Sequence, residues 1–365
     1  IVILAYKLLF SDFDGHVGQP GLALHLEHQW IEIANLGLLL LGFALLSRHF
    51  EESKLPDLAP DILPDDWLGG LALLGIIFVM SAFLDNIAGA LIGATIAAHV
   101  YRKRVHIGFL AAIVAASNAG GSGSVVGDTT TTMMWIAGKN PLDVLHAYVG
   151  AIAAFAVFAI PAARMQQRYA PILKHDVGGI VVDWARFAIV VFLLISAIGA
   201  NVSANLFAPD LLHAIPVIGL ALWAALLIAW PLRAPDWKVM PETIKGTAFL
   251  LSLVLAASMM PVEQLPAPSW ESAFGLGFVS AVFDNIPLTA LALQQGNYDW
   301  GVLAYAVGFG GSMMWFGSSA GVAVSNMFPE AKSVVAWLRA AWFVPAAYVV
   351  GFFVMLGVMG WHPRP

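Results

Sequence analysis

Ser81-Ala-Phe-Leu-Asp-Asn-Ile87 returns 199 residues later as Ser280-Ala-Val-Phe-Asp-Asn-Ile286. Each copy lies inside a long apolar segment, the first within residues 68–100 and the second within residues 270–296. An Asp-Asn pair in such surroundings breaks the apolar pattern at the same place twice. This recurrence predicts that the chain consists of two related halves.

A second motif follows each copy and strengthens that prediction. Gly120-Gly-Ser-Gly-Ser-Val-Val-Gly127 interrupts the apolar segment 105–138, and Gly310-Gly-Ser-Met-Met-Trp-Phe-Gly317 interrupts the segment 301–325. The two motifs recur in the same order at nearly the same offset, so chance is a poor explanation. Each half is therefore expected to contain an Asp-Asn break followed by a glycine-rich break.

The composition places these breaks in a membrane protein. Of 365 residues, 60% are hydrophobic and only 11% are charged, and the mean hydropathy is +0.81. A soluble protein carries about 25% charged residues, and a disordered one has low hydrophobicity, so both classes are excluded. The absence of cysteine excludes disulfides and thiolate sites, and a net charge of −6 without a basic run argues against nucleic acid.

Six further apolar segments of near-spanning length complete the pattern and predict an all-α polytopic membrane protein embedded in a lipid bilayer. They cover residues 31–48, 147–164, 187–206, 213–231, 246–260 and 334–360. The opening stretch 1–10 is too short to span and reads as the end of a longer first helix, without signal-peptide features.

Interrupted apolar segments have a physical requirement. Unwound backbone is tolerated at membrane depth only inside protein or beside a water-filled cavity, and glycine frees the chain to leave the helix. Paired interrupted segments in two repeats indicate a transporter binding site. We treat 68–100 and 270–296 as re-entrant hairpins and 105–138 and 301–325 as broken helices.

The distribution of positive charge orients this topology. If successive spans cross the membrane in opposite directions, one side of the membrane holds the loops 49–67, 101–106, 164–186, 231–245 and 326–339. With Arg48, at the edge of the first of them, that side holds 14 Lys and Arg residues, whereas the other side keeps Lys7, Lys139 and Arg364. The positive-inside rule makes the first side cytoplasmic.

The predicted fold is therefore an inverted repeat. The first hairpin opens to the cytoplasm and the second to the outside, and the C-terminus lies outside. The N-terminal repeat covers 1–163, a cytoplasmic linker covers 164–186, and the C-terminal repeat covers 187–365.

Three acidic residues lie deep in the apolar segments, and all three are at the breaks: Asp85, Asp128 and Asp284. Each costs at least about 2.5–3.5 kcal/mol at a helix centre unless it is neutralised or paired. No Lys or Arg lies deep enough in a span to pair with them. Such a carboxylate can take a proton, bind a metal cation or be solvated in a cavity, and a group that alternates between proton and cation is an exchange site.

The neighbouring groups offer oxygen ligands for a small hard cation such as Na⁺ or Li⁺. Amides, hydroxyls and the carbonyls of the unwound glycine segments supply them. The candidate ion- or substrate-binding residues are Asp85, Asn86, Asn118, Gly120, Gly121, Ser122, Asp128, Thr129, Thr130, Asp284, Asn285, Gly310, Gly311, Ser312, Ser318 and Ser319. Among them Asp85, Asp128 and Asp284 are the expected ligands of the transported metal ion; no cofactor is expected.

Purely structural roles stand beside these. Asp85 and Asp284 have the chemistry of helix N-caps, and Pro287 in the following turn fits that role. Asp128, which precedes four threonines, is a still better cap candidate. Asn118 has the character of a polar residue that hydrogen-bonds a neighbouring helix.

The four motif strings together resemble the NhaD-type sodium/proton antiporters of the ion transporter superfamily, which also contains citrate transporters and arsenite permeases. The resemblance covers roughly residues 67–325, and Gly127-Asp-Thr-Thr-Thr131 resembles the NhaD branch in particular. It implies a homodimer whose subunits have a scaffold part and a transport part that moves like an elevator. It places the site between the two hairpin tips and the two broken helices.

The leading interpretation is a secondary active antiporter of a bacterial inner membrane that exchanges Na⁺ or Li⁺ for H⁺ and is not an enzyme. The alternative is a citrate or dicarboxylate symporter, or an arsenite or silicic acid efflux transporter. Negative charge at both tips ranks citrate lower. A membrane-embedded enzyme is a third hypothesis, but the chain contains no H-E-x-x-H motif, and its Gly-Ser-Gly-Ser run lacks nucleophile-elbow spacing.

Overall fold

The computed structural model of the protein describes residues 12–13, 16–58, 63–125, 127–172, 181–212, 214–259 and 266–365. Regular structure in these ranges is helical apart from β1 (Asp12–Phe13) and β2 (His16–Val17), which pair antiparallel. The expected all-α class is thus confirmed for this part of the chain. The expected helix end at 1–10, Lys7, and residues 173–180 of the linker with Lys174 lie outside the described residues.

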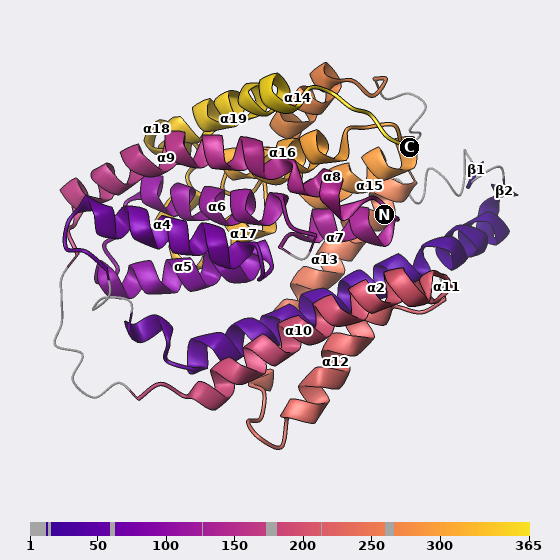
Figure 1. Cartoon of the computed structure of the whole chain (residues 1–365), viewed down its shortest axis with the longest axis horizontal. Helices are drawn as coiled ribbons and strands as arrows, with labels where there is room; N and C mark the ends of the chain where they lie inside the picture. Colours follow the sequence, from indigo (N-terminus) through magenta and orange to yellow (C-terminus); the bar gives the residue numbers. More distant parts are fainter. Residues whose placement is uncertain are drawn as a thin grey trace.

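The chain combines long helices with shorter ones that flank the breaks (Figure 1). The first half contains α2 (Gly18–Glu52), η1 (Pro56–Leu58), α4 (Trp67–Ser81), α5 (Asn86–Val100), α6 (Ile107–Ser122), α7 (Thr129–Ile136), α8 (Pro141–Leu145) and α9 (Ala147–Tyr169). The second half contains α10 (Trp184–Phe207), α11 (Pro209–Leu212), α12 (Val217–Ala229), η2 (Trp237–Val239), α13 (Met240–Ser258), α14 (Trp270–Ser280), α15 (Asn285–Gln295), α16 (Trp300–Gly310), η4 (Gly311–Met313), α17 (Ser319–Met327), η5 (Pro329–Lys332), α18 (Val334–Ala340) and α19 (Phe343–Met359).

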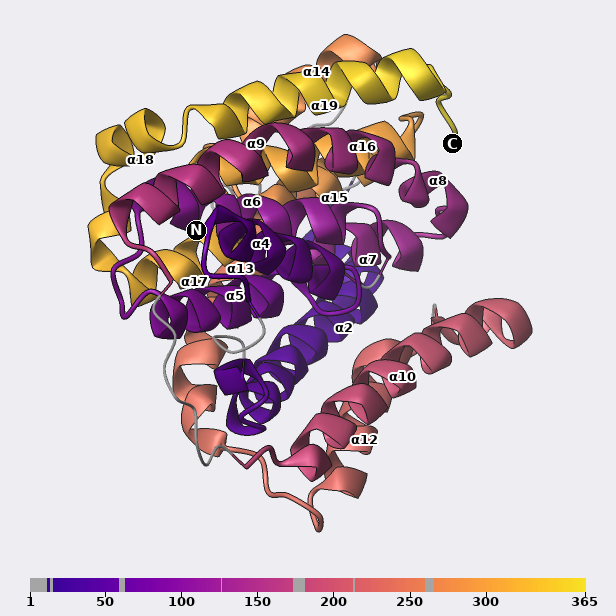
Figure 2. The same ribbon diagram turned by 60° about the vertical axis from the view of Figure 1, so that its left-hand side comes forward.

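The helices form two groups, which we call the core bundle and the arm. The core bundle holds α4 to α9 and α14 to α19, with α6 and α16 at its centre: almost every residue of these two helices is buried. The arm holds α2, α10, α12 and α13, and Figure 2 shows α10 and α12 standing away from the bundle. The four interrupted segments all belong to the core bundle.

Close contacts between backbones hold the arm together. Asn35 on α2 accepts a hydrogen bond from the backbone N–H of Gly219 on α12 at 2.7 Å, and the Trp223 indole donates to the carbonyl of Leu38 at 2.9 Å. The missing side chain of Gly219 makes this approach possible, since a Cβ there would lie 2.5 Å from the Cβ of Leu38. α13 packs against both α2 and α15, so it joins the arm to the core bundle.

The breaks occur where the motifs predict them. Residues 82–85 separate α4 from α5, residues 281–284 separate α14 from α15, and the glycine-rich stretches separate α6 from α7 and α16 from α17. Two glycines explain how the segments pack so closely. A Cβ on Gly120 would lie 2.0 Å from the carbonyl oxygen of Phe78, and a Cβ on Gly310 would lie 2.3 Å from that of Gly277.

One apolar segment differs from its expected form. The segment 334–360 reads as a single uninterrupted span, but the structure divides it into α18 and α19 with a bend of 60° between them. Pro345 explains the new start, because proline fits the first turn of a helix and cannot sit in a helix interior without breaking the hydrogen bonding of the preceding turn.

Membrane-spanning length is met by four helical stretches among the described residues, or five if the bent pair α18–α19 is one span. They are Gln29–Glu52, Pro141–Tyr169, Trp184–Ala204 and Trp237–Ala256. The helices α4, α5, α6 and α12 are apolar but shorter, and the first three of them adjoin the breaks.

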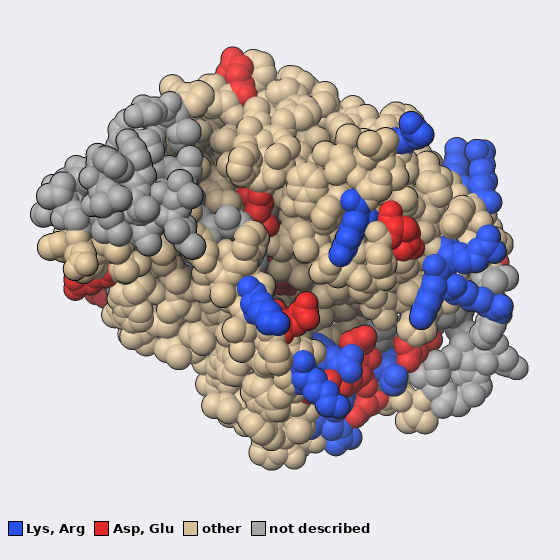
Figure 3. Space-filling view, turned by 180° about the vertical axis from the view of Figure 1, so that it is seen from behind, with Lys and Arg blue, Asp and Glu red and all other residues tan. Residues whose placement is uncertain are grey.

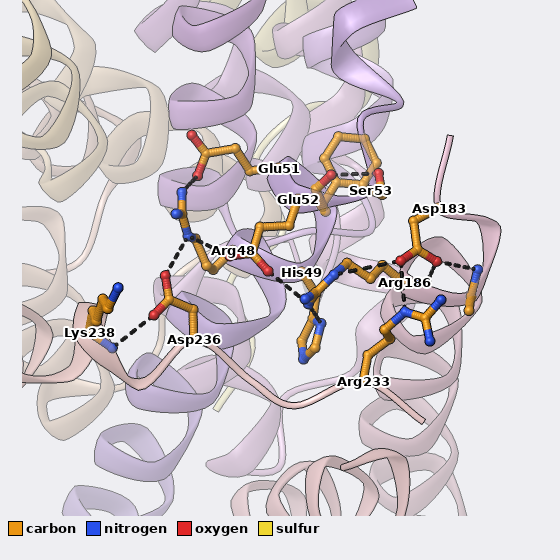
Figure 4. Close-up of polar contacts among 12 residues, drawn as sticks. Arg48, His49, Glu51, Glu52, Ser53, Asp183, Arg186, Arg233, Asp236 and Lys238 are labelled. Atoms are coloured by element: carbon orange, nitrogen blue, oxygen red, sulfur yellow. Dashed lines mark hydrogen bonds and ion pairs between the residues drawn. The ribbon is translucent and has the colours of Figure 1, made fainter. Parts of the chain in front are cut away.

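Positive charge gathers at one end of the molecule. Figure 3 shows blue side chains over only one half of the visible face, and tan surface, which carries no Lys, Arg, Asp or Glu, over much of the rest. The network in Figure 4 lies at this end, where α2 ends and α10 begins. Arg48 contacts Asp236 at 3.1 Å, Arg186 contacts Glu52 at 2.8 Å, and Arg233 contacts Asp183 at 2.7 Å. The network joins α2, α10 and the segment before α13 within the arm.

The Asp183–Arg233 pair predicts a pH dependence of stability. The hydrogen bond from Arg233 lowers the pKa of Asp183 below its usual value near 3.8. A carboxyl whose pKa is lower in the folded protein stabilises the fold above its unfolded pKa, and this contribution is lost as the pH falls through the folded value. We expect the thermal midpoint of the wild type to fall more steeply below about pH 4 than that of Asp183→Asn.

Thermal unfolding followed by tryptophan fluorescence from pH 3 to 7 measures this difference. Asparagine keeps an oxygen for the N-cap bonds to Ala185 and Arg186, so the substitution isolates the charge. The expected effect is small because the pair is exposed. Parallel curves for the wild type and Asp183→Asn would show that the ion pair adds nothing.

Candidate functional site

The two Asp-Asn tips have almost the same local structure. Asp85 has φ −51° and ψ 144° and caps α5 by accepting from the N–H of Ile87 at 3.2 Å. Asp284 has φ −54° and ψ 143° and caps α15 by accepting from the N–H of Ile286 at 3.0 Å. The N-cap geometry expected of both is therefore present, and each uses one carboxylate oxygen for it.

The other carboxylate oxygen of each tip meets a hydroxyl from a broken helix. Thr129, the first residue of α7, donates to Asp85 Oδ1 at 3.3 Å, and Ser319, the first residue of α17, donates to Asp284 Oδ2 at 3.0 Å. Thr129 and Ser319 occupy matching positions 190 residues apart. Tip and broken helix thus meet in the same way in both halves.

Asn118 joins the two halves at the centre. Its side-chain oxygen accepts from Asn86 at 3.1 Å, and its amide nitrogen donates to Ser312 at 3.0 Å and to Ser318 at 3.1 Å. All four side chains are buried. The expected hydrogen bonding of Asn118 to neighbouring helices is confirmed, and its partners are themselves predicted site residues.

Asp128 breaks the symmetry of the cluster. It is buried, caps α7 through the N–H of Thr130 at 3.0 Å, and lies 3.5 Å from the amide nitrogen of Asn285. The matching residue in the second half is Ser318, a neutral cap of α17. Asp128 is within electrostatic reach of both Asp85 and Asp284.

Fixed positive charge is lacking around these acids in the part of the chain that the structure describes. Within the described ranges, no Lys, Arg or His forms an ion pair with Asp85, Asp128 or Asp284. In the same residues, no three His, Cys, Asp or Glu side chains lie close enough together to hold one metal ion. Each acid therefore has its own set of neutral oxygen and nitrogen partners.

The glycines and Ser122 have packing roles in this conformation. The carbonyl of Gly120 accepts from the Tyr148 hydroxyl at 3.1 Å, and Ser122 donates to the carbonyl of Ala119 at 2.9 Å. A Cβ on Gly121 would lie 2.4 Å from the carbonyl oxygen of Gly127, and one on Gly311 would lie 2.6 Å from that of Gly317. Because these glycines have no side chain, the two ends of each glycine-rich break can pack against each other.

A cavity of about 540 Å³ opens onto part of the cluster; we call it the central cavity. Of the predicted site residues, Asp85, Asp284 and Ser319 line it, while the others lie behind them. Figure 3 shows the molecule hollowed on this face, with acidic side chains in and beside the hollow. The cavity lies between the arm helices α2 and α13 and the core bundle.

Several lining residues have no counterpart in the sequence motifs. Glu242 and Thr243, in the first turn of α13, and Ser47, on α2, contribute polar groups to the wall. Glu242 in the sequence has only the signature of an acidic residue at a helix start, which is common because it offsets the helix dipole. Only the packing of α13 against the core bundle reveals it as a cavity residue.

Comparison with known proteins gives relatives of one kind, although no family model matches the chain. Sodium/proton antiporter 1 of Arabidopsis thaliana is 25% identical over 93% of this chain and 64% of its own length, so the chain spans less than two thirds of that relative. Sodium/proton antiporter 2 of the same plant is 23% identical over 92% of this chain and 88% of its own length. The Na(+)/H(+) antiporter NhaD of Vibrio parahaemolyticus is 26% identical over 88% of this chain and 89% of its own length.

The apolar helices and these relatives together define the class: the chain is an integral, polytopic helical membrane protein. Its relatives carry the names of sodium/proton antiporters, and two further proteins named Na(+)/H(+) antiporter NhaD match over 91% and 92% of the chain.

Proposed function

We propose that the protein is a secondary active transporter that exchanges Na⁺, or Li⁺, for H⁺ across a membrane. The observation that carries the proposal is the pair Asp85, which is buried, and Asp284, which is partly buried: both carboxylates face one cavity, and neither forms an ion pair with a Lys, Arg or His among the described residues. The names of the relatives favour the same activity and favour transport over catalysis.

The chemistry of the tips suits alternating occupancy by proton and metal ion. A carboxylate in an apolar bundle must be neutralised, and a proton and Na⁺ are two ways of doing so. With Thr129 and Ser319 beside them, Asp85 and Asp284 offer oxygen ligands, which hard monovalent cations prefer. Asp128, set behind Asp85, holds further negative charge that favours a cation in the cluster.

Two serine hydroxyls lie beside the apolar stretch that follows the first tip, where the stretch itself offers no side-chain oxygen. Ile87-Ala-Gly-Ala90 carries no side-chain oxygen. Ser81 and Ser117 lie against it with their hydroxyls 3.0 Å apart, and Ser117 donates to the carbonyl of Asn86 at 2.5 Å. A Cβ on Gly89 would lie 2.9 Å from the Ser117 hydroxyl, so the small residue lets these groups approach.

The inverted repeat, the elevator motion and the homodimer belong to the same proposal. The matching tip geometry of Asp85 and Asp284 and the matching bonds of Thr129 and Ser319 support two related halves. The division into a core bundle with all four breaks and an arm supports a moving part and a scaffold. The gathering of positive charge at one end supports a cytoplasmic side there, with the C-terminus at the other.

Proton flux in proteoliposomes tests the activity. Purified protein is reconstituted with a fluorescent pH reporter, a pH gradient is imposed, and Na⁺, Li⁺, K⁺, citrate and arsenite are added in turn. We expect Na⁺ or Li⁺ to dissipate the gradient in protein-containing vesicles and not in empty ones. Flux that depends on citrate or arsenite, without a response to either cation, would replace the antiporter with one of the alternative transporters.

A further inference from the structure

The central cavity is much larger than an inorganic cation requires. Its volume is about 540 Å³, whereas one water molecule needs about 10–15 Å³ of such space. A dehydrated Na⁺ held between a carboxylate and a hydroxyl would occupy only a small part of it. The chemistry of the walls indicates which larger ligand would fit there.

Those walls are largely apolar and partly aromatic. Four phenylalanines line the cavity, two from the arm and two from the core bundle, and aliphatic side chains of α2, α5 and α17 fill the space between them. The phenylalanines are Phe43, Phe249, Phe283 and Phe316. Such a surface binds an apolar or aromatic body and, through the ring faces, an organic cation.

The charge of the cavity has one sign. Asp85, Asp284 and Glu242 line it, and among the described residues no Lys, Arg or His does so. Within the same described ranges, none of these three acids forms an ion pair with a side chain. An anion would be repelled, and a neutral molecule would leave the carboxylates without compensation.

We propose that the central cavity is a binding site for organic monocations with an apolar body, whose charge lies at Asp85 and Asp284 and whose body lies against Phe43 and Phe249. Such a ligand matches both the apolar, partly aromatic walls of the cavity and its negative charge. It also occupies the carboxylates at which the inorganic cation is proposed to bind, so the two compete. The competition rests on the proposed function, whereas the binding itself does not.

Benzyltrimethylammonium is a suitable probe. Its positive charge is permanent, so unlike an amine it carries no proton and cannot itself collapse a pH gradient. Neopentylbenzene has the same shape without the charge and is the matched neutral control. Isothermal titration calorimetry on the detergent-purified full chain measures binding, and the proteoliposome assay measures competition with Na⁺.

We expect benzyltrimethylammonium to bind, and rising Na⁺ to weaken it. Loss of one aromatic contact, in Phe43→Ala or Phe249→Ala, is expected to raise its dissociation constant between about twofold and thirtyfold. Asp85→Asn and Asp284→Asn are each expected to weaken binding as well. Phe207→Ala, an exposed position on α10 outside the cavity, is the matched control and is expected to change nothing.

Two results would overturn the proposal. Equal binding of neopentylbenzene would make the cavity a neutral apolar slot, as for a lipid chain. Unchanged binding in both phenylalanine variants would place the cation elsewhere. If the protein shows no cation-dependent proton flux but binds benzyltrimethylammonium with the expected variant pattern, the antiporter function fails while the binding site stands.

Discussion

Asp85→Asn and Asp284→Asn should each abolish Na⁺-dependent proton flux while leaving the protein folded. Removal of one partner from a buried charge interaction costs about 2–5 kcal/mol. That range corresponds to a loss of about thirtyfold to several thousandfold in cation affinity. The reconstituted pH-gradient assay measures the loss over a range of Na⁺ concentrations.

Substitution by asparagine separates the helix-capping role of these residues from their proposed role in binding a proton or a metal ion. Asparagine caps a helix about as well as aspartate, so the bonds to Ile87 and Ile286 can persist in the variants. It cannot hold an exchangeable proton or a negative charge. If both variants exchange ions at the wild-type rate, Asp85 and Asp284 are helix caps and nothing more.

Glu271→Gln is the matched control for these variants. Glu271 lies on α14, in the same helix pair as Asp284, but it is exposed in the first turn and does not line the central cavity. We expect it to transport normally. Equal losses in Glu271→Gln and Asp284→Asn would point to general damage of this helix pair.

The second large effect is expected at Gly120, where alanine should destabilise the core bundle. A Cβ at this position would lie 2.0 Å from a backbone oxygen of α4, which cannot rotate away as a side chain can. Forcing extra volume into a packed site costs about 1–3 kcal/mol, and occasionally more. Thermal unfolding in detergent, followed by tryptophan fluorescence, should show a lower midpoint for Gly120→Ala and for its counterpart Gly310→Ala.

Gly199→Ala is a control that we expect to raise the thermal midpoint. Gly199 lies within α10, and a Cβ there would meet no atom within 4 Å. Alanine at such a helical position stabilises by about 0.4–1 kcal/mol, because it reduces the freedom of the unfolded chain. If Gly120→Ala and Gly199→Ala shift the midpoint alike, the close approach to Phe78 is not what holds the first broken helix in place.

The sequence predicts those features that depend on local chemistry. Asp85, Asp284, Asp128 and Ser318 cap helices because the preference for a short polar side chain at a helix start needs no knowledge of the rest of the fold. The breaks at the glycine-rich stretches follow from the same kind of rule. The repeat adds a second, independent copy of each signal, which is why all four breaks could be located.

Features that depend on distant packing were not predictable. Glu242 and Phe249 lie on a helix that approaches the tips only after the arm folds against the core bundle. The hydroxyls of Ser81 and Ser117 reach Gly89 and its neighbours from two other helices. The bend before α19 was missed because a proline in the first turn of a helix is visible only once the helix boundary is known.

The hydrogen bonds of Asn118 have a mechanical consequence. One amide ties the first tip, through Asn86, to the opposite broken helix, through Ser312 and Ser318. Moving the first tip relative to the second broken helix must break at least one of these buried bonds, each worth about 0.5–1.5 kcal/mol and more if a partner stays unpaired. Since Ser319 of that broken helix in turn donates to Asp284, the two acidic tips belong to one chain of hydrogen-bonded segments, and we expect them to be displaced as one body.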